Sequence, residues 1–309
     1  MSEISIAIHG GAGTLVKGTM TSEKELAYKS ALKLALDAGY SILEKGASSI
    51  QAVEAAVKVL EDSHLFNAGK GSVFTAEGTH EMDASIMDGD TLNAGAVSLV
   101  SGIKNPISLA KDVMEKSEHV FLAGEGALIF AKENGYEQTP PNYFFDEFRH
   151  QQWLEIKDTD SFQLDHATKK DSKFGTVGAV ACDKNGNVAA ATSTGGMTNK
   201  KWGRVGDSPM IGAGNYANNE TCAISCTGSG EFFIRGVVAY DVSCLMEHKN
   251  YALEKAEDEV INKGILKIKG DGGLMAVDAK GIISMPFNTE GMYRACKSSK
   301  GREEVLIYK

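Results

Sequence analysis

Proline and cysteine are both scarce in this sequence. The chain has five prolines and five cysteines among its 309 residues. An odd number of cysteines cannot all pair, and none forms the C-x-x-C pairs of a structural zinc site. These absences exclude a fully paired disulfide framework and predict reduced, mostly buried thiols. The residues concerned are Cys182, Cys222, Cys226, Cys244 and Cys296.

Basic residues and long apolar runs are also lacking. The 32 lysines and arginines are outnumbered by 41 aspartates and glutamates, which gives a formal net charge of −9. This balance argues against nucleic acid as a partner, because phosphate backbones are bound by basic surfaces. No apolar run reaches the roughly 18 residues of a membrane span. The first ten residues do not resemble a signal peptide, so we expect no membrane partner and a cytoplasmic location.

Glycine, in contrast, is abundant. The 34 glycines make up about 11% of the chain, compared with roughly 7% in average proteins. Many of them gather in short motifs that separate apolar segments. With 42% apolar residues, the chain is long enough to form one large domain or two ordinary ones.

The first half of the chain alternates between strand and helix patterns. An initial strand is expected to run into a tight turn at His9–Gly13. Ser22 with Glu25, and Ser48 with Gln51, have the spacing of a capping box and predict the starts of two helices. Further strands are expected at 81–87, 92–100 and 119–122, the first two as a hairpin, and helices at 106–115 and 125–134.

The second half begins after a change in composition between residues 136 and 175. An amphipathic turn around 143–156 is followed by the polar run DTDSFQLDHATKKDSK, which predicts a linker. Buried strands that pair as a hairpin are expected at 175–182 and 188–194. A further strand is expected at 222–226, helices at 232–247 and 253–261, and a closing hairpin. Hairpins mixed with helix pairs predict an α+β fold with helices outside packed sheets.

Thr176 occupies an unusual position for a residue with a purely structural role. It begins a buried strand and follows Gly175 at the end of the linker. A threonine hydroxyl needs an adjacent base to act as a nucleophile, and cleavage of the preceding bond supplies one in the residue's own α-amine. Gly175 would tolerate the strained backbone that such cleavage requires. On these residues alone, an ordinary strand start remains the alternative.

Three further segments carry polar groups suited to the same chemistry. Thr192 and Thr194 lie on the strand expected to pair with that of Thr176. Arg204 and Asp207, three residues apart, are either a surface ion pair or a complement for the carboxylate and ammonium of an α-amino acid. The segment Thr227–Glu231 lies between a strand and a helix, where backbone N–H groups and a hydroxyl could hold an oxyanion.

The glycine-rich segment His9–Gly13 does not predict a nucleotide site, and the histidines do not predict a transition-metal site. His9–Gly13 has neither the G-x-G-x-x-G pattern nor the Gly-Lys-Ser/Thr of a phosphate-binding loop. The seven histidines include no H-x-x-x-H pair, and an isolated histidine such as His80 is more often structural than a metal ligand.

Eight motifs in order give the chain a specific resemblance. They are IAIHGGAG, FNAGKGSVFT, HEMDASIMDG, GTVGAVA, ATSTGGMTNK, GRVGDSP, SCTGSGE and PFNTEGMYRA. With them the chain resembles the plant-type asparaginase or isoaspartyl peptidase family of N-terminal-nucleophile hydrolases, close to the bacterial isoaspartyl dipeptidases. The resemblance covers nearly everything outside the linker.

The resemblance implies a four-layer αββα sandwich whose precursor cleaves itself between Gly175 and Thr176. An α subunit of residues 1–175, ending in a linker at about 136–175, and a β subunit of residues 176–309 would together form one αββα domain and assemble as an (αβ)2 heterotetramer. Thr176 would be the nucleophile, cleaving β-aspartyl dipeptides and L-asparagine through a threonine ester and releasing L-aspartate. The other roles implied are assistance by Thr194, oxyanion binding by Thr227 and Gly228, lining of the site by Asn67, binding of the α-carboxylate by Arg204, and binding of the α-amine by Asp207 and the Gly230 carbonyl.

The family also carries a sodium-binding loop made mainly of backbone carbonyls. By position, its residues here are Leu60, Glu61, Ser63, Phe66, Ala68 and Lys70. The resemblance implies no cofactor for catalysis itself.

Three other functions remain as alternatives. Glycosylasparaginase and taspase-like hydrolases share the fold, and a relative could persist as a non-catalytic scaffold. The loop KKWGRVGDSP and the short linker favour the peptidase branch. Intact Thr176, Thr194, Arg204 and Asp207 argue against the scaffold.

Overall fold

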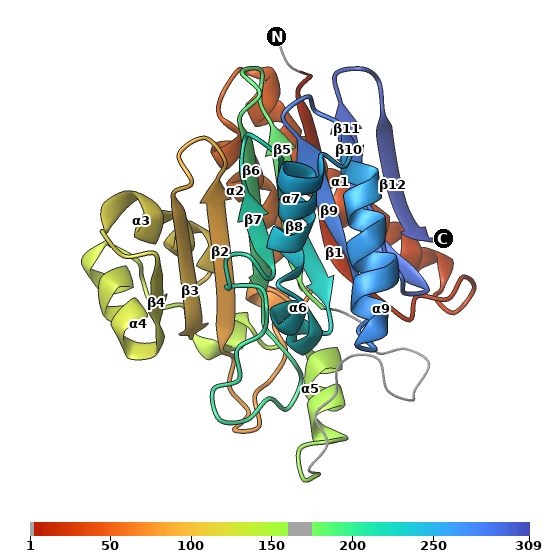
Figure 1. The fold of residues 1–309 in the computed structure, drawn as a ribbon. Helices are drawn as coiled ribbons and strands as arrows, with labels where there is room; N and C mark the ends of the chain where they lie inside the picture. Colours follow the sequence, from red (N-terminus) through yellow and green to blue (C-terminus); the bar gives the residue numbers. More distant parts are fainter. Residues whose placement is uncertain (1–2, 160–174) are drawn as a thin grey trace.

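Two β-sheets form the frame of the protein in the computed structural model, which describes residues 3–159 and 175–309 (Figure 1). Within these residues, the larger sheet has the order β12-β11-β1-β5-β6-β2-β3-β4, and the smaller has the order β10-β9-β8-β7. Neighbouring strands of the larger sheet are antiparallel, apart from β3 and β4, which are parallel. The large sheet comprises β1 (Ser5–Gly13), β2 (Met82–Asp88), β3 (Ala94–Val100), β4 (Phe121–Ala123), β5 (Val177–Cys182), β6 (Val188–Thr194), β11 (Gly291–Ser298) and β12 (Glu303–Tyr308), and the small sheet β7 (Asn215–Ala217), β8 (Cys222–Gly228), β9 (Gly272–Asp278) and β10 (Ile283–Ser284).

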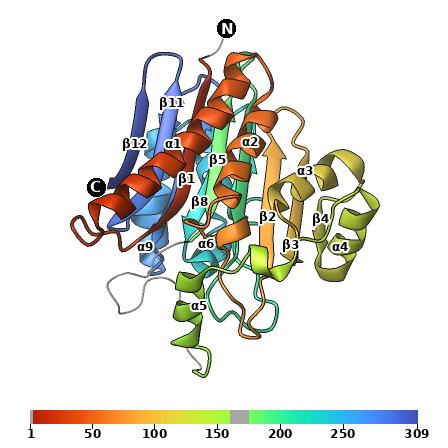
Figure 2. The ribbon, with the colours of Figure 1, turned by 180° about the vertical axis from the view of Figure 1, so that it is seen from behind.

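Helices cover the outer faces of both sheets. Figure 2 shows α1 and α2 crossing the large sheet, with α3 and α4 beyond them. The helices of the second half pack against β8 and β9 of the small sheet. The helices are α1 (Ser22–Glu44), α2 (Ser49–Glu61), α3 (Pro106–Lys116), α4 (Gly124–Glu133), α5 (Glu147–Leu154), α6 (Gly230–Gly236), α7 (Val238–Lys249), α8 (Leu253–Glu257) and α9 (Ile265–Lys267), with 3-10 turns at Gly69–Gly71 and Pro141–Tyr143 and a π-helical turn at Asp258–Gly264.

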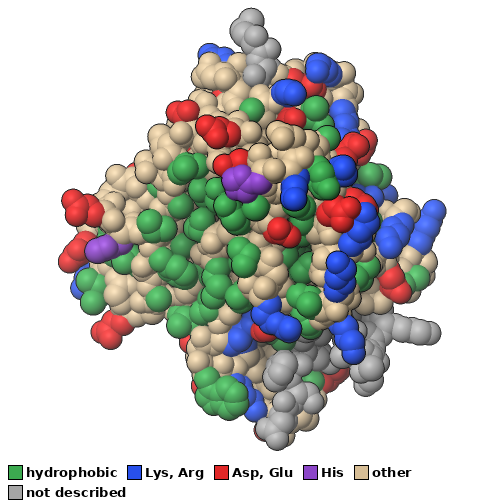
Figure 3. All heavy atoms as spheres, viewed as in Figure 1, with side chains coloured by type: hydrophobic (Ala, Val, Ile, Leu, Met, Phe, Trp, Pro, Cys, Tyr) green, Lys and Arg blue, Asp and Glu red, His purple; other side chains and the backbone are tan. Residues whose placement is uncertain are grey.

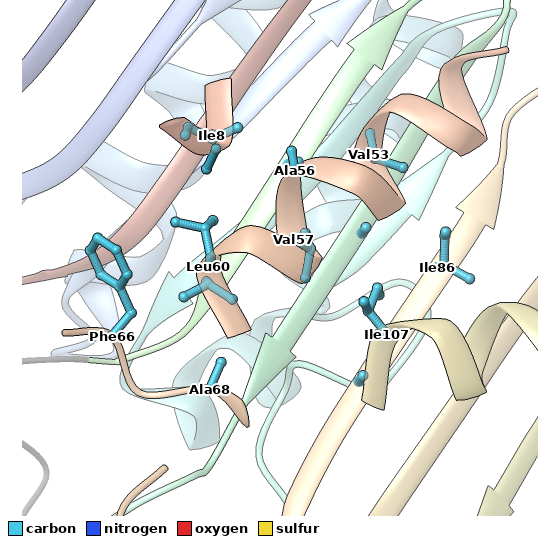
Figure 4. Close-up of a cluster of buried hydrophobic side chains, with 14 of the residues drawn as sticks. Ile8, Val53, Ala56, Val57, Leu60, Phe66, Ala68, Ile86 and Ile107 are labelled. Atoms are coloured by element: carbon cyan, nitrogen blue, oxygen red, sulfur yellow. The ribbon is translucent and has the colours of Figure 1, made fainter. Parts of the chain in front are cut away.

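Three hydrophobic clusters hold these elements together. One lies between the large sheet and α1, α2 and α3, and Figure 4 shows α2 in it, presenting Val53, Val57 and Leu60 among buried neighbours. A second lies between the two sheets, and a third lies between the small sheet and its helices. The side chains of β5 alternate between the first two clusters, because successive residues of a strand face opposite sides. This double burial explains why β5 is apolar along its whole length.

Most of the elements expected from the sequence are present, and two details of the first half are wrong. The capping box of Ser48 and Gln51 is confirmed at the start of α2. The cap of α1, however, is Thr21 rather than Ser22, and its side chain accepts a hydrogen bond from the Lys24 N–H. His9–Gly13 is not a tight turn but the second half of β1. Its glycines are drawn into a strand because β11 supplies hydrogen-bond partners along it, with an irregularity between His9 and Gly11.

In the second half, both expected hairpins are confirmed, and both long helices are interrupted. Val237, with a φ of 47°, separates α6 from α7. A π-helical turn separates α8 from α9. Of the expected linker, residues 136–159 include α5, on which Arg149 is buried, while residues 160–174 lie outside the described part of the chain. Four of the five cysteines are buried, and all five are free thiols.

Candidate active site

Thr176 lies where the two sheets meet, at the start of β5. β5 and β6 pair so that Val177 faces Ser193, and one step further along this register brings Thr176 beside Thr194. The Thr176 side chain is buried, and its hydroxyl is hydrogen-bonded to that of Ser208 at 3.2 Å. Figure 1 shows the end of β8 and α6 at the same edge of the sheets, next to α5. The site is therefore assembled from strand ends and the loops that follow them.

A buried chain of polar groups fixes the backbone of Thr176. The Thr176 carbonyl can only accept, so His9 Nδ1 carries the proton and donates to it at 3.0 Å. His9 Nε2 then accepts from the Ser225 hydroxyl at 2.9 Å, and Ser225 accepts from Thr192 at 2.7 Å. Asn215 Nδ2 donates to the Thr192 hydroxyl at 3.2 Å. Burial lowers the pKa of His9 to about 3, so the imidazole in this series of hydrogen bonds is neutral.

Thr227 approaches the bond before Thr176 from the smaller sheet. A Cβ built on Gly175 would lie 3.0 Å from the Thr227 hydroxyl oxygen, so Gly175 and Thr227 are neighbours. That oxygen accepts from the Ala12 N–H at 3.3 Å, which leaves its own hydrogen available to a further acceptor. The next residue, Gly228, ends β8. A hydroxyl donor thus lies next to Gly175.

Asn67 and Thr194 are joined through the turn that follows β6. Asn67 Nδ2 donates to the Gly196 carbonyl at 2.7 Å, and the Gly196 N–H donates to the Thr194 hydroxyl at 3.0 Å. Thr194 therefore keeps its hydroxyl hydrogen for another acceptor on the side of Thr176. Both residues are buried.

Arg204 and Asp207 lie together beside Gly230. A Cβ on Gly230 would stand 2.8 Å from Asp207 Oδ1 and 3.0 Å from an Arg204 terminal nitrogen, so a side chain there would have to displace these groups. Arg204 Nε donates to Glu231 at 2.9 Å, which leaves its terminal nitrogens for a second anion. Asp207 is buried, and its Oδ2 has no hydrogen-bond partner among the described residues. Burial raises the pKa of Asp207 to about 7, against the opposing charge of Arg204.

Comparison with known proteins identifies the family of the chain. Residues 2–307 match the asparaginase family. The chain belongs to this family. It is 49% identical to an isoaspartyl peptidase of Escherichia coli over 96% of this chain and 93% of that protein. It is 43% identical to an isoaspartyl peptidase/L-asparaginase of Xenopus laevis, over 93% of this chain and 90% of that protein.

Two parts of this asparaginase-family site were not found from the sequence. Ser208 is the hydroxyl partner of Thr176, and it directly follows Asp207 in the motif GRVGDSP, so its place in that motif was the available signal. His9 was interpreted as part of a structural turn, whereas it is hydrogen-bonded to the Thr176 carbonyl. Its role depends on β1 and β5 being neighbours, which residue spacing does not reveal.

The loop that follows α2 turns backbone carbonyl groups toward its own glycines. A Cβ on Gly69 would collide with the Glu61 carbonyl oxygen, and one on Gly71 with those of His64 and Phe66. The described residues contain no cluster of three metal-ligating side chains. A cation held here would therefore depend on carbonyl oxygens, which suit a hard ion.

Proposed function

We propose that this chain is an autoproteolytically activated amidohydrolase that cleaves β-aspartyl dipeptides and L-asparagine and releases L-aspartate. The observation that carries the proposal is the position of Thr176. Its hydroxyl, the Thr227 hydroxyl and the Arg204–Asp207 pair come from three separate segments and lie around one strand end. The relatives named isoaspartyl peptidase, at about half identity, support the same function.

Maturation would begin with attack of the Thr176 hydroxyl on the Gly175 carbonyl carbon. The Gly175–Thr176 amide bond breaks, the hydroxyl proton passes to the departing nitrogen, and an ester remains. Water then hydrolyses the ester, leaving the Gly175 carboxylate and a free Thr176 amine. The Thr227 hydroxyl beside Gly175 is placed to donate to the oxyanion formed in the first step.

Hydrolysis of the substrate would reuse the same groups. The free α-amine of Thr176 accepts the hydroxyl proton as the oxygen attacks the side-chain carbonyl of the β-aspartyl group. Thr227 and the Gly228 N–H hold the oxyanion, and Thr194 donates a hydrogen bond to the nucleophile. The leaving amine takes the proton, and water then hydrolyses the β-aspartyl ester to free L-aspartate.

Recognition of the aspartyl group would depend on its two α-substituents. The Arg204 nitrogens that do not bind Glu231 are available to the α-carboxylate. The unpartnered Asp207 Oδ2 and the Gly230 carbonyl are available to the α-ammonium. A buried carboxylate oxygen without a partner is costly, and a bound ammonium would remove that cost.

We infer that the two sheets and their helices form the four-layer αββα sandwich of N-terminal-nucleophile hydrolases. The three stacked hydrophobic clusters support this arrangement. We further propose an α subunit of residues 1–175 and a β subunit of residues 176–309 that stay together. Strands of both segments alternate in the large sheet, with β1 between β11 and β5 and with β6 beside β2.

Two copies of the αβ unit would associate to form an (αβ)2 assembly. Figure 3 shows apolar side chains gathered across the middle of one face of the molecule, while charged side chains lie mostly around them. α7 crosses this face in Figure 1, and its exposed residues include Tyr240. An apolar area of this kind supports association between copies.

A sodium ion would fit the loop at residues 60–70 through the carbonyls of Leu60, Glu61, Ser63, Phe66, Ala68 and Lys70. The convergence of carbonyl oxygens on Gly69 and Gly71 supports this site. The ion would stiffen the loop that leads to Asn67, and it takes part in no bond-making step. Among the described residues, no helix is both long enough and apolar enough to cross a membrane, and we propose a cytoplasmic location.

The test is denaturing intact-mass measurement with N-terminal sequencing, followed by assays. In proportion to length, cleavage of the 32.9 kDa chain before Thr176 gives fragments of roughly 19 and 14 kDa. The matured protein should then release aspartate from β-aspartyl dipeptides and asparagine, and Thr176→Ala should abolish both cleavage and hydrolysis. A chain that stays whole, or that matures but prefers glycosylated asparagine, would contradict the proposal.

A further inference from the structure

Asp83 is a buried charge that the proposed chemistry does not use. It lies on β2 directly across from Thr194 of β6, and its side chain is inaccessible to solvent. Asp83 Oδ2 has no hydrogen-bond partner among the described residues. Burying a carboxylate without full pairing costs free energy, so a specific role is needed to explain its presence here.

The carboxylate of Asp83 holds an irregular turn of the neighbouring strand. The pairing of β2 with β3 shifts here, so that both Ser98 and Leu99 stand opposite Asp83. Leu99 has a φ of 57°, in the left-handed region that favours glycine at such bulges. Its N–H donates to Asp83 Oδ1 at 3.0 Å. Asp83 thereby replaces the strand partner that the bulge removes.

The side chain of Leu99 lies beside the loop that carries Arg204. A Cβ on Gly203 would lie 3.4 and 3.9 Å from the two methyl carbons of Leu99, which is ordinary contact distance. Gly203 itself is left-handed, at a φ of 66°, and so are Trp202 and Asn199. A loop with three such residues needs external support to keep one conformation. The methyl groups of Leu99 lie beside Gly203, one residue before Arg204, and are placed to give that support.

A buried lysine strengthens the same connection. Lys200 is almost wholly buried, and its Nζ donates to the Glu81 carbonyl at 2.7 Å, two residues before Asp83. The charges of Lys200 and Arg204 both favour the ionised form of Asp83, although burial leaves its pKa above the ordinary value. Both ends of the loop segment 200–204 are therefore attracted toward β2.

We propose that Asp83 is a positioning residue for substrate binding. By holding Leu99 against Gly203, it fixes the loop that presents Arg204 to the α-carboxylate and Asp207 to the α-ammonium of the β-aspartyl group. This inference rests on the proposed function. It assigns to the motif HEMDASIMDG a task that is separate from the nucleophile and the oxyanion donors.

The test compares Asp83→Ala and Leu99→Gly with the wild type and with Asp88→Asn. Leu99→Gly suits the left-handed backbone but removes the methyl groups that lie beside Gly203. Asp88→Asn is the matched control, because Asp88 lies on the same strand and its side chain holds only the adjoining turn at Asp90 and Thr91. Cleavage into two fragments serves as the check that each variant folds.

Both Asp83→Ala and Leu99→Gly should mature, and both should raise KM for a β-aspartyl dipeptide about tenfold with kcat changed less than about threefold. Inhibition by L-aspartate should weaken by the same factor. The double variant should be no worse than either single variant, because both changes break one chain of contacts. An unchanged KM in Leu99→Gly, or effects that simply add, would overturn the proposal. If the wild type and Asp88→Asn both mature but neither hydrolyses a β-aspartyl dipeptide, the proposed function itself would be refuted.

Discussion

At the scale of single residues, we expect the ionisation of Asp207 to control binding of the proposed substrate's amine. Burial raises the pKa of its carboxyl group to about 7, while the charge of Arg204 opposes the shift. Glu231 and Asp83 add negative charge nearby and raise the pKa further. Only the ionised form can pair with an α-ammonium, so we expect the site to gain affinity for an amino acid as the pH rises toward neutrality.

Affinity for L-aspartate should therefore follow the titration of Asp207. Below the pKa of about 7, the carboxyl group is neutral, and the inhibition constant should weaken roughly tenfold for each pH unit of acidification. Above that pKa the constant should level off. The measurement is competitive inhibition by L-aspartate from pH 5 to pH 9, with succinate, which lacks the amine, as the control ligand. Asp207→Asn should flatten the curve, and an unchanged slope in that variant would refute the assignment.

Ser208 provides the hydroxyl next to that of Thr176, the proposed nucleophile, in the uncleaved chain. Since it is hydrogen-bonded to the Thr176 hydroxyl at 3.2 Å, Ser208→Ala should lower kcat by about tenfold to a hundredfold with little change in KM. It should also slow maturation, followed by denaturing gel electrophoresis over time. Ser243→Ala removes an equally buried hydroxyl from α7 and is the control. Equal effects of the two variants would show that the loss is structural.

At the scale of elements, α8 carries a buried acid into the outer core. Glu257 is almost wholly buried where α8 continues into the π-helical turn, and neither carboxylate oxygen has a hydrogen-bond partner among the described residues. Burial raises the pKa of Glu257 to about 8. The folded chain therefore keeps a proton that the unfolded chain releases from about pH 4.5 upward, and Glu257 costs stability as the pH rises toward 8.

Glu257→Gln should remove this pH-dependent cost. Relative to the parent, the variant should gain about 1–3 kcal/mol in free energy of unfolding at pH 8 and little at pH 5. Urea denaturation in the uncleaved Thr176→Ala background, at one fixed protein concentration, keeps the two segments joined in a single chain during unfolding. The control is Glu259→Gln on the same π-helical turn, where the carboxylate pairs with exposed Lys263. A gain that does not change with pH would show that ionisation is not the cause.

At the scale of the whole molecule, the large sheet interleaves the segments on either side of Thr176. β1 pairs with β11 on one side and β5 on the other, and β2 pairs with β6. α2 also packs on β5 and β6 in the shared core. Cutting the chain before Thr176 removes one covalent bond and none of these contacts.

Both fragments should therefore stay together after cleavage. Size-exclusion chromatography with light scattering should show them in one peak, at about twice 32.9 kDa if an (αβ)2 assembly forms. The fragments should separate only in denaturant, and the uncleaved Thr176→Ala protein should elute at the same position. Free fragments of roughly 19 and 14 kDa under native conditions would contradict this expectation.

The sequence by itself determined the local features of the protein. The capping box at Ser48 and Gln51, the hairpin of residues 177–194 and the apolar face of α2 all follow from spacing between near neighbours. Such patterns are readable because the residues that interact lie a few positions apart. The prominence of Thr176 also came from the sequence, since a linker ends directly before a buried strand.

The groups that meet from distant parts of the chain could not be paired before the arrangement of the strands was known. His9 contacts Thr176 across 167 positions of the chain, and Leu99, whose N–H donates to Asp83, lies beside Gly203 in the loop that carries Arg204. His9–Gly13 likewise forms a strand because it pairs with β11, although its glycines favour a turn. The physical reason is that buried hydrogen bonds and close packing are satisfied between strands whose order no local pattern encodes.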